Sequence, residues 1–481
     1  MKSYGPFFIT VLMIFGLCFL LFTRVRPEYK DVPQEEPEPV VAVNDGGADA
    51  GAEAGSVVAV ADAAGAAEAA APKPPAEKPI RVAALGWELV AAGVDMTSPA
   101  VELAPETALD AVEARLARGG NDSQGADVAI VPLPAFVASY ERLRALEPKV
   151  FLVVGFSRGR EEVHANAGAL LKPPPGNDEV KLVALGPATN GDANMRQAGS
   201  ESATVLGLFA LDLLGVAPAR LRFVPSGSEA AKTAPFSAII RGASDERKLA
   251  LSSSDASRFI PIVAVAPKGV LESRGKALDD WSKAWLEGLA RAGKDAPGVA
   301  RRLATKDNVT FAAGVGGAPE ALHLVERLGQ IDASKAPASA PIEMVMQRTW
   351  QLARAGGLTT SAAPDPLPID ARAASGAKPA PAAGDADAGA FGPIPAGSTP
   401  LVLYRATDSA ADANAVAAQI GFLAGVFDRA VFKVTAKGGD KAAKAIAAAA
   451  RDKYEVPQAR LAIAGGEPQG AFATVEILAP P

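Results

Sequence analysis

The sequence is poor in the residues that build metal sites and disulfides. Among 481 residues there are one cysteine and two histidines. The single Cys18 excludes an intramolecular disulfide, and two histidines argue against a histidine-rich metal centre. Basic residues form no block and the net charge is −6, which argues against a nucleic-acid-binding surface. We therefore expect no metal, no cofactor and no nucleic-acid partner.

Charge is absent from one long apolar run near the N-terminus. Residues 6–22 read PFFITVLMIFGLCFLLF, a run of 17 residues. This length lies at the short end for a membrane-spanning helix, and no small-x-small cleavage site follows. We predict an uncleaved transmembrane anchor in residues 1–27. Lys2 precedes the run and Arg24, Arg26 and Lys30 follow it, so the positive-inside rule alone would keep the remaining chain in the cytoplasm.

Two stretches lack the apolar residues needed for a core. Residues 28–78 begin with an acidic, proline-bearing segment and continue as Ala/Gly repeats; residues 371–398 have a similar Ala/Gly/Pro-rich composition. Such segments cannot bury enough apolar surface to fold, so we expect linkers here. Two folded blocks are left, at residues 79–370 and 399–481.

The large block alternates short apolar strands with amphipathic helices. Residues 180–215 give the pattern most fully: a strand over 181–185, a polar loop, and a helix from about Ser200 to Gly215. Serine before an apolar run and glycine after it are helix-capping signals. A strand leading into a capped helix directs free backbone N–H groups at a ligand, although many such units bind nothing. The alternation predicts an α/β fold with parallel strands. Strands are expected at 81–85, 126–131, 150–154, 221–224, 249–254 and 260–266, and helices at 106–118, 135–146, 276–292, 297–305, 319–328 and 342–355.

An ordered set of features in this block resembles the periplasmic solute-binding proteins of ABC transporters, of the sulfonate, nitrate or thiamine-precursor type. The features are Gly86-Trp87 after the opening strand, Gly-Ala-Asp-Val-Ala within residues 116–129, Pro132, the serine-rich turn at 200–204, and FIPIVAVAPKGVL followed by a helix with two tryptophans. The resemblance implies two α/β lobes around a cleft, a small polar solute as ligand, and an ABC permease as partner.

Five residues are the cleft candidates that the resemblance implies: Trp87, Pro132, Ser200, Ser202 and Ser254. Trp87 would stack on a ligand, or belong to the core. Ser202 would donate to an oxyanion, or simply cap the helix. Ser254 would be a ligand donor, or part of a polar turn. No arginine stands at a recognisable strand end, so the sequence leaves the binding of an anion open.

The small block predicts the element order β-α-β-α-β-β. Strands are expected at 401–404, 430–436, 461–464 and 471–478, and helices at 411–426 and 440–453. This α+β block resembles a shortened OmpA-like domain, best at VPQARLAIAGGEP (residues 456–468), and the resemblance implies peptidoglycan as a partner. The aspartate of the family's Gly-His-Thr-Asp loop is missing, because residues 434–439 read VTAKGG, and its helical arginine is replaced near Lys441 or Ala442.

One motif raises an enzymatic alternative. Residues 155–159 read GFSRG and fit the G-x-S-x-G pattern of serine hydrolases around Ser157, with Asp279 or Asp280 and then His323 in the required chain order. A nucleophile elbow needs a packed helix directly after the serine, whereas REEVHANAGALLKPPP follows here. We therefore assign no catalytic residue.

The sequence thus leaves two main hypotheses. The first is a membrane-anchored envelope protein, held by residues 6–22 in the inner membrane with its bulk in the periplasm, whose solute-binding-like module captures or senses a small polar solute. The second is a structural or tethering protein with decayed solute and peptidoglycan sites. A polar-lined cleft near Trp87, Pro132 and Ser202 would favour the first, and a packed, dry interface there the second.

Overall fold

A computed structural model describes residues 78–176, 178–184, 200–241, 243, 245–304, 325–326, 340–372, 391–407 and 412–481. The predicted anchor at residues 6–22, the linker up to residue 77, and His323 lie outside this set. Within it, no helix is long and apolar enough to cross a membrane. Residues Pro75–Pro481 form one compact unit, and the description below concerns this unit alone.

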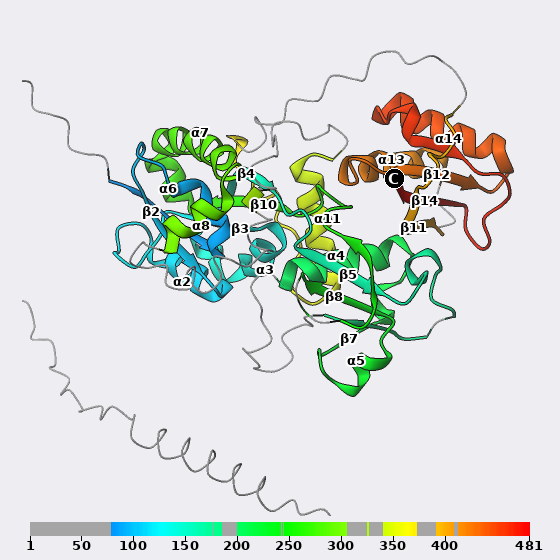
Figure 1. Cartoon of the computed structure of the whole chain (residues 1–481), viewed down its shortest axis with the longest axis horizontal. Helices are drawn as coiled ribbons and strands as arrows, with labels where there is room; N and C mark the ends of the chain where they lie inside the picture. The colour runs from blue at the N-terminus through cyan, green and yellow to red at the C-terminus, as the bar shows by residue number, and fades with distance from the viewer. Residues whose placement is uncertain are drawn as a thin grey trace, which may run out of the picture. The chain divides into compact units, whose positions relative to one another are not determined.

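The first lobe is built on a five-stranded sheet in the order β2-β1-β3-β10-β4 (Figure 1). Strands β1, β2 and β3 are parallel, whereas β10 is antiparallel to both of its neighbours. Because this sheet is covered on both faces, its central strands are continuous apolar runs such as PIVAVA in β10, where all six residues are buried. The strands are β1 (Ile80–Leu85), β2 (Val101–Glu106), β3 (Val128–Pro132), β4 (Lys149–Phe156) and β10 (Pro261–Ala266).

The alternation of side chains along β1 separates two cores. Ile80, Val82 and Ala84 point into one, which we call the outer core, and Ala83 and Leu85 into the other, the main core. The outer core is closed by the 3-10 helix η1 (Trp87–Gly93) and by α7 (Gly275–Ala292) and α8 (Ala296–Ala304). The main core begins under α2 (Leu109–Arg118) and α3 (Leu133–Leu143).

The second lobe carries a second five-stranded sheet, in the order β7-β6-β8-β5-β9. Helix α4 (Ser200–Leu213) packs on it, and α11 (Ile342–Ala355) packs on both α3 and α4. Because α4 is enclosed on every side, nearly all of its residues are buried. The remaining elements of this lobe are β5 (Glu161–Ala165), β6 (Val180–Val183), β7 (Leu221–Val224), β8 (Phe236–Ile240), β9 (Lys248–Ser252) and α5 (Glu229–Thr233).

In the described part of the chain, two segments run directly from a strand of one lobe to a strand of the other. The first crossover, residues 157–160, joins β4 to β5, and the second, residues 253–260, joins β9 to β10. The two crossovers are hydrogen-bonded to each other: the amide of Ser157 donates to the carbonyl of Ile260 at 2.8 Å, and the amide of Gly159 to the Ser253 hydroxyl at 2.8 Å. Two sheets joined in this way fit a periplasmic-binding-protein-like fold.

The C-terminal domain has a four-stranded sheet in the order β11-β14-β12-β13, with the helices α13 and α14 packed against each other. Its chain order β-α-β-α-β-β agrees with the sequence expectation. Strand β14 places Ala473, Val475 and Ile477 in the main core, which therefore extends from the lobes into this domain. The elements are β11 (Thr399–Ala406), α13 (Ala413–Val426), β12 (Val431–Ala436), α14 (Gly439–Tyr454), β13 (Leu461–Ile463) and β14 (Ala473–Ala479).

The sequence analysis missed several short elements. Strand β2 is an edge strand with only one fully buried residue, so it lacks a strong apolar signal. Strand β5 reads EEVHA, and its polar side chains find partners only in the folded chain. The other missed elements are β8, η1, α5, α6 (Lys268–Ser273) and the 3-10 helices η2 (Arg144–Leu146), η3 (Ala169–Leu171), η5 (Pro218–Arg220) and η7 (Gln458–Arg460).

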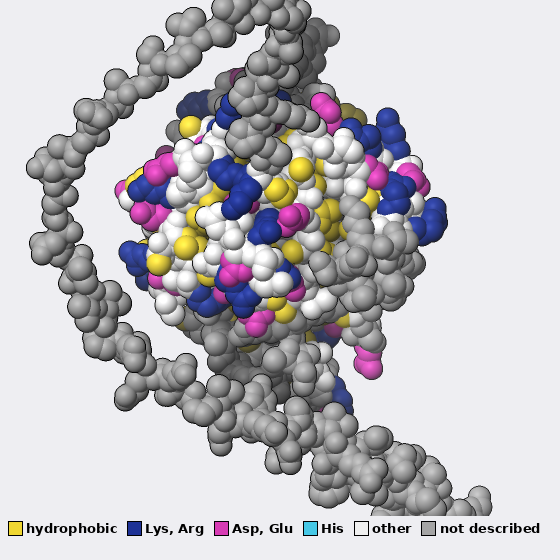
Figure 2. All heavy atoms as spheres, turned by 90° about the vertical axis from the view of Figure 1, so that its left-hand side faces the viewer, with side chains coloured by type: hydrophobic (Ala, Val, Ile, Leu, Met, Phe, Trp, Pro, Cys, Tyr) yellow, Lys and Arg dark blue, Asp and Glu magenta, His cyan; other side chains and the backbone are white. Residues whose placement is uncertain are grey.

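Basic and acidic side chains are mixed over the first lobe. Figure 2 views the left-hand side of Figure 1 and shows Lys/Arg and Asp/Glu interspersed among small apolar areas. On the described part of this face, neither sign of charge dominates. Several charged side chains of the first lobe are paired, as in Arg302 with Asp95 at 2.8 Å.

Candidate functional site at the amino end of helix α4

Two hydroxyl groups without partners mark the amino end of α4. The Oγ atoms of Ser200 and Ser202 are both buried and have no hydrogen-bond partner among the described residues. The Ser202 side chain is fully enclosed, with 0% of its surface exposed. A buried hydroxyl without a partner costs about 1–3 kcal/mol, so each such group in a folded protein calls for an explanation. One explanation is a bound polar molecule.

The same end of α4 also carries the backbone amides of the first helical turn. The first amide groups of any α-helix have no partner within the helix, and they carry partial positive charge. Helix α4 has 14 residues, long enough for this effect to develop. Backbone amides and two serine hydroxyls are the donor set that suits a small oxyanion.

Helix α3 brings charged groups close to this end. The pKa of Arg142 is raised, chiefly by its hydrogen bonds to Glu113 and in smaller part by the charge of Glu201 in the first turn of α4. Arg142 donates to the two Glu113 oxygens at 2.6 and 2.5 Å, and the Ser139 hydroxyl donates to the same carboxylate at 2.7 Å. The guanidinium is thus held by Glu113, and the charge of Glu201 adds a smaller contribution to the rise in its pKa.

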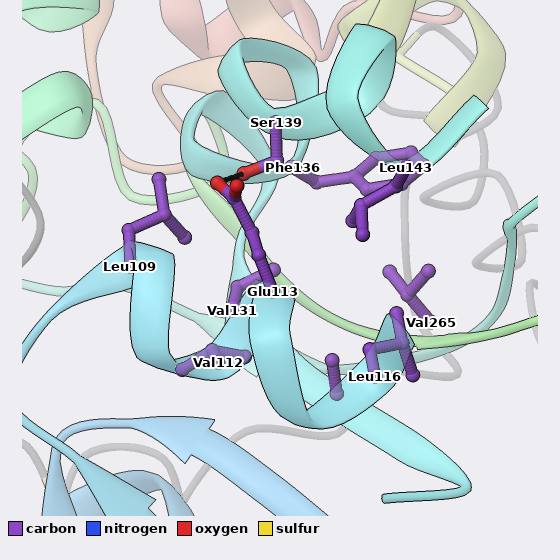
Figure 3. Close-up of a pocket in the computed structure, with 10 residues that line it drawn as sticks. Leu109, Val112, Glu113, Leu116, Val131, Phe136, Ser139, Leu143 and Val265 are labelled. Atoms are coloured by element: carbon purple, nitrogen blue, oxygen red, sulfur yellow. Dashed lines mark hydrogen bonds between the residues drawn. The ribbon is translucent and has the colours of Figure 1, made fainter. Parts of the chain in front are cut away.

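A small cavity lies beneath this ion pair. Figure 3 shows Glu113 and Ser139 meeting among apolar side chains of α2, α3 and the sheet. Its volume of about 10 Å³ is enough for one water at most. The cavity is lined by Leu109, Val112, Glu113, Leu116, Ala129, Val131, Phe136, Ser139, Leu143 and Val265, so it is part of the packing of the first lobe and too small for a solute.

The structure separates the five residues that the sequence singled out. Trp87 opens η1, is 2% exposed, and belongs to the outer core. Its ring is therefore packed between α7 and the sheet, which corresponds to the core alternative. Pro132 ends β3 and is the residue before α3, where its fixed φ and missing donor are tolerated. Ser200 and Ser202 share the amino end of α4.

Ser254 lies in the second crossover. Its amide donates to the Ser252 hydroxyl at 3.2 Å, while Ser252 is itself held by Asp255 through its amide and its hydroxyl, both at 2.8 Å. This arrangement is a polar turn, the structural alternative for this residue. Of the five residues, Ser200 and Ser202 are the two that the structure brings together, at the amino end of α4.

The hydrolase alternative fails on geometry. Ser157 is followed by a crossover and then by strand β5, so the strand–turn–helix of a nucleophile elbow is missing. The Ser157 hydroxyl is fully buried and donates to Glu161 at 2.5 Å. The two alternative triad acids, Asp279 and Asp280, lie on α7. Asp279 pairs with Arg372 at 3.6 Å and Asp280 with Lys276 at 3.1 Å.

An ionisable group directly after the first crossover, Glu161 at the start of β5, escaped the sequence analysis. Glu161 is fully buried, and burial raises the pKa of its carboxyl, although Arg160 and the Ser157 hydroxyl act in the opposite direction. Arg160 also pairs with Glu88 of the first lobe at 3.3 Å. The only sequence signal is the run SRGREE between two apolar strands, which by itself suggests an exposed turn.

Comparisons with known proteins concern the fold alone. No protein-family model matches the chain, and no curated protein matches it. Among solved structures, a putative sulfonate-binding protein SsuA from Methylobacillus flagellatus KT is similar, with 13% identity, 61% of this chain and 92% of that chain covered, and a TM-score of 0.41. The periplasmic aliphatic sulphonate-binding protein SsuA from Escherichia coli has 11% identity and a TM-score of 0.40, and the match covers 59% of this chain and 89% of that chain. The periplasmic nitrate-binding protein NrtA from Synechocystis PCC 6803 has 11% identity and a TM-score of 0.32, and the match covers 47% of this chain and 66% of that chain. At these scores the likeness carries no functional argument, and the OmpA-like resemblance and peptidoglycan gain no support.

Proposed function

We propose that the two-lobed unit captures a small polar solute bearing an oxyanion at the amino end of α4. The observation that carries the proposal is the pair of buried hydroxyls, Ser200 and Ser202, without partners among the described residues. An oxyanion would accept from both hydroxyls and from the first amides of the helix, which removes the cost of burying them unpaired.

The proposal is tested by calorimetry on the full chain with sulfate, nitrate and methanesulfonate as probes. A hydrogen bond to a charged group contributes about 1.5–3 kcal/mol, so Ser202→Ala should weaken binding of the preferred probe by roughly tenfold or more. Without a probe, Ser202→Ala should be as stable as the unmodified chain or more so, because the deleted hydroxyl has no partner among the described residues.

Ser237→Ala is the matched control. Ser237 lies on β8 of the same lobe, is likewise 0% exposed, and donates to Asp245 at 2.6 Å. Its removal should lower stability by about 1–3 kcal/mol and leave the affinity unchanged. If none of the three probes produces binding heat or stabilises the chain, the capture of an oxyanion is rejected.

A second candidate function is a fixed scaffold that tethers other molecules. The observation that favours it is the continuity of the main core, in which Phe136 of α3, Phe209 of α4 and Trp350 of α11 belong to one cluster. This interface is packed and apolar, as expected for lobes that do not open. Small-angle scattering that is unchanged by every probe would support the scaffold, and a compaction with any probe would oppose it.

We further propose that residues 6–22 anchor the chain in the inner membrane, that the described unit is periplasmic, and that an ABC permease is the partner if solute is delivered. The support is the apolar run and the fold. A reporter active only in the periplasm, fused after Pro481, should be active; an inactive reporter on a stably expressed fusion would reverse the topology.

A further inference from the structure

The C-terminal domain touches both crossovers through one corner, residues 426–428, where α13 ends. The amide of Arg258, in the second crossover, donates to the carbonyl of Val426 at 3.1 Å, and the Ser257 hydroxyl reaches the same carbonyl at 3.5 Å. Asp428 lies in the same corner, two residues after Val426. Its carboxylate pairs with Arg158, in the first crossover, at 2.8 Å.

A single carboxylate thus connects the two crossovers. The same Oδ2 atom of Asp428 that accepts from Arg158 lies 4.0 Å from Nε of Arg258. All three side chains are mostly enclosed, with exposed fractions of 21%, 18% and 23% for Arg158, Arg258 and Asp428. Charges at this depth are weakly screened by solvent, so this contact differs from the exposed ion pairs elsewhere on the surface.

Aromatic packing adds to the charged contact. Phe259 of the second crossover stacks on Phe209 of α4, with ring centroids 3.9 Å apart. The ring of Phe427, in the corner, stacks on the same Phe209 ring, with centroids 6.2 Å apart. The corner, the second crossover and α4 therefore share one aromatic stack, which is fully buried.

The corner is held in its shape from within the C-terminal domain. Arg460 donates to the carbonyls of Ala430 at 2.8 Å and Ala424 at 3.1 Å, and also to that of Phe427. Burial lowers the pKa of Arg460 to about 10, with Asp428 acting in the opposite direction. Three backbone carbonyls on one guanidinium fix the loop that presents Asp428.

We propose that the C-terminal domain is a clamp on the crossovers, and that the pairing of Asp428 with Arg158 and Arg258 limits how freely the two lobes move relative to each other. Residues 157–160 and 253–260 are the two connections that run directly from a strand of one sheet to a strand of the other in the described part of the chain, so a change in the angle between the sheets would bend both. A module fixed to both segments opposes that rearrangement without touching the solute site.

One consequence rests on the proposed function. Helix α4 carries Ser202 at its amino end and Phe209 further along, so solute binding and clamp contacts act on the same helix. If solute binding favours one arrangement of the lobes, the clamp and the solute influence each other by the same free energy.

The clamp is tested by amide hydrogen exchange on the full chain, which needs no solute. Asp428→Asn is nearly isosteric and removes the charge that both arginines share. We expect the amides of residues 156–159 and 257–260 to exchange roughly tenfold faster, because loss of a partly buried charged hydrogen bond promotes local opening. Glu476→Gln is the matched control: it removes a carboxylate of the same domain that pairs with Lys433, at 3.1 Å, and should leave these amides unchanged.

A second variant separates the clamp from a general loss of structure. Arg158→Gln should produce the same local increase, and the double variant with Asp428→Asn should exchange no faster than Asp428→Asn alone, since both remove one contact. Protection along β12 and β14 should persist in all variants. Unchanged exchange at the crossovers in Asp428→Asn would overturn the proposal, whatever Arg158→Gln does.

Calorimetry on the same samples keeps the two proposals apart. Faster crossover exchange with no binding of any probe supports the clamp and rejects the solute site. Binding that Ser202→Ala weakens, with crossover exchange unaffected by Asp428→Asn, supports the solute site and rejects the clamp.

Discussion

Substitution of Gly288 by alanine should destabilise the first lobe, against the ordinary preference of helices. Gly288 lies in α7 where it crosses η1, and a Cβ atom there would be 2.2 Å from the carbonyl oxygen of Ala92 and 3.0 Å from its carbonyl carbon. The atoms in the way belong to the backbone, and all of η1 is buried. Neither α7 nor η1 can therefore move apart without loss of packing in the core. Overpacking of this kind costs about 1–3 kcal/mol. We place the Gly288→Ala clash at the upper end, against a gain of about 1 kcal/mol in helix propensity, and expect a net loss of about 2 kcal/mol.

Tryptophan fluorescence during urea unfolding measures this loss directly. Trp281 and Trp285 lie on α7 and Trp87 on η1, and all three are in the outer core that the clash would disturb. Gly269→Ala on α6 is the control, because a Cβ there would meet nothing within 4 Å; it should be neutral or stabilising by up to about 1 kcal/mol. A Gly288→Ala chain as stable as the unmodified one would refute the close packing of α7 on η1.

Two further substitutions probe the crossovers and the aromatic stack. Burial raises the pKa of the Glu161 carboxyl above its ordinary value of 4.5. Between the pKa of the unfolded chain and that of the folded chain, the folded chain therefore keeps a proton that the unfolded chain has lost. The free energy of unfolding falls as the pH rises through this range. Glu161→Gln should remove this fall, so that its urea stability relative to the unmodified chain increases with pH above 4.5, by at most about 1.4 kcal/mol per pH unit; a difference independent of pH would contradict the raised pKa. Phe209→Ala, which opens the stack with Phe259, should lower the free energy of unfolding by about 3–5 kcal/mol, whereas Phe209→Leu should cost less because it fills more of the space; equal losses in the two variants would argue against tight packing at this ring.

The sequence predicted those elements whose burial is local in origin. Strands β1, β3 and β10 are continuous apolar runs because helices cover both faces of their sheet, and such runs are visible without tertiary information. Strand β5 is different, since Glu161 and His164 also depend on partners that are distant in the sequence. The Ser253 hydroxyl accepts from the Glu161 amide, and the carbonyl of Arg247 lies 3.0 Å from His164 Nδ1. The insertion of β10 between β3 and β4 is likewise a long-range pairing that no local pattern encodes.

For the candidate site too, only the features with a local sequence signal were predictable. Ser200 and Ser202 follow from a helix-start signal, which is local. Whether their hydroxyls have partners depends on what packs around α4, and this the sequence does not specify. Trp87 shows the opposite case, because a tryptophan after a strand has the same local signature in a cleft and in a core, and the packing of α7 decides between them.

Helix α4 explains why capture of a solute and the packed interface do not exclude each other. Near its carboxyl end, Asp212 pairs with Arg348 of α11, and burial raises the pKa of Asp212 while Arg348 opposes the shift. An acidic group is unfavourable at a helix carboxyl end, so this pairing is what makes Asp212 tolerable and fixes that end to the main core. The amino end, with Ser202, has no described partner for its hydroxyl. A helix fixed at one end, and with no described hydroxyl partner at the other, can gain hydrogen bonds from a solute without any opening of its apolar faces. The dry interface therefore argues against large lobe movement but not against the proposed oxyanion site.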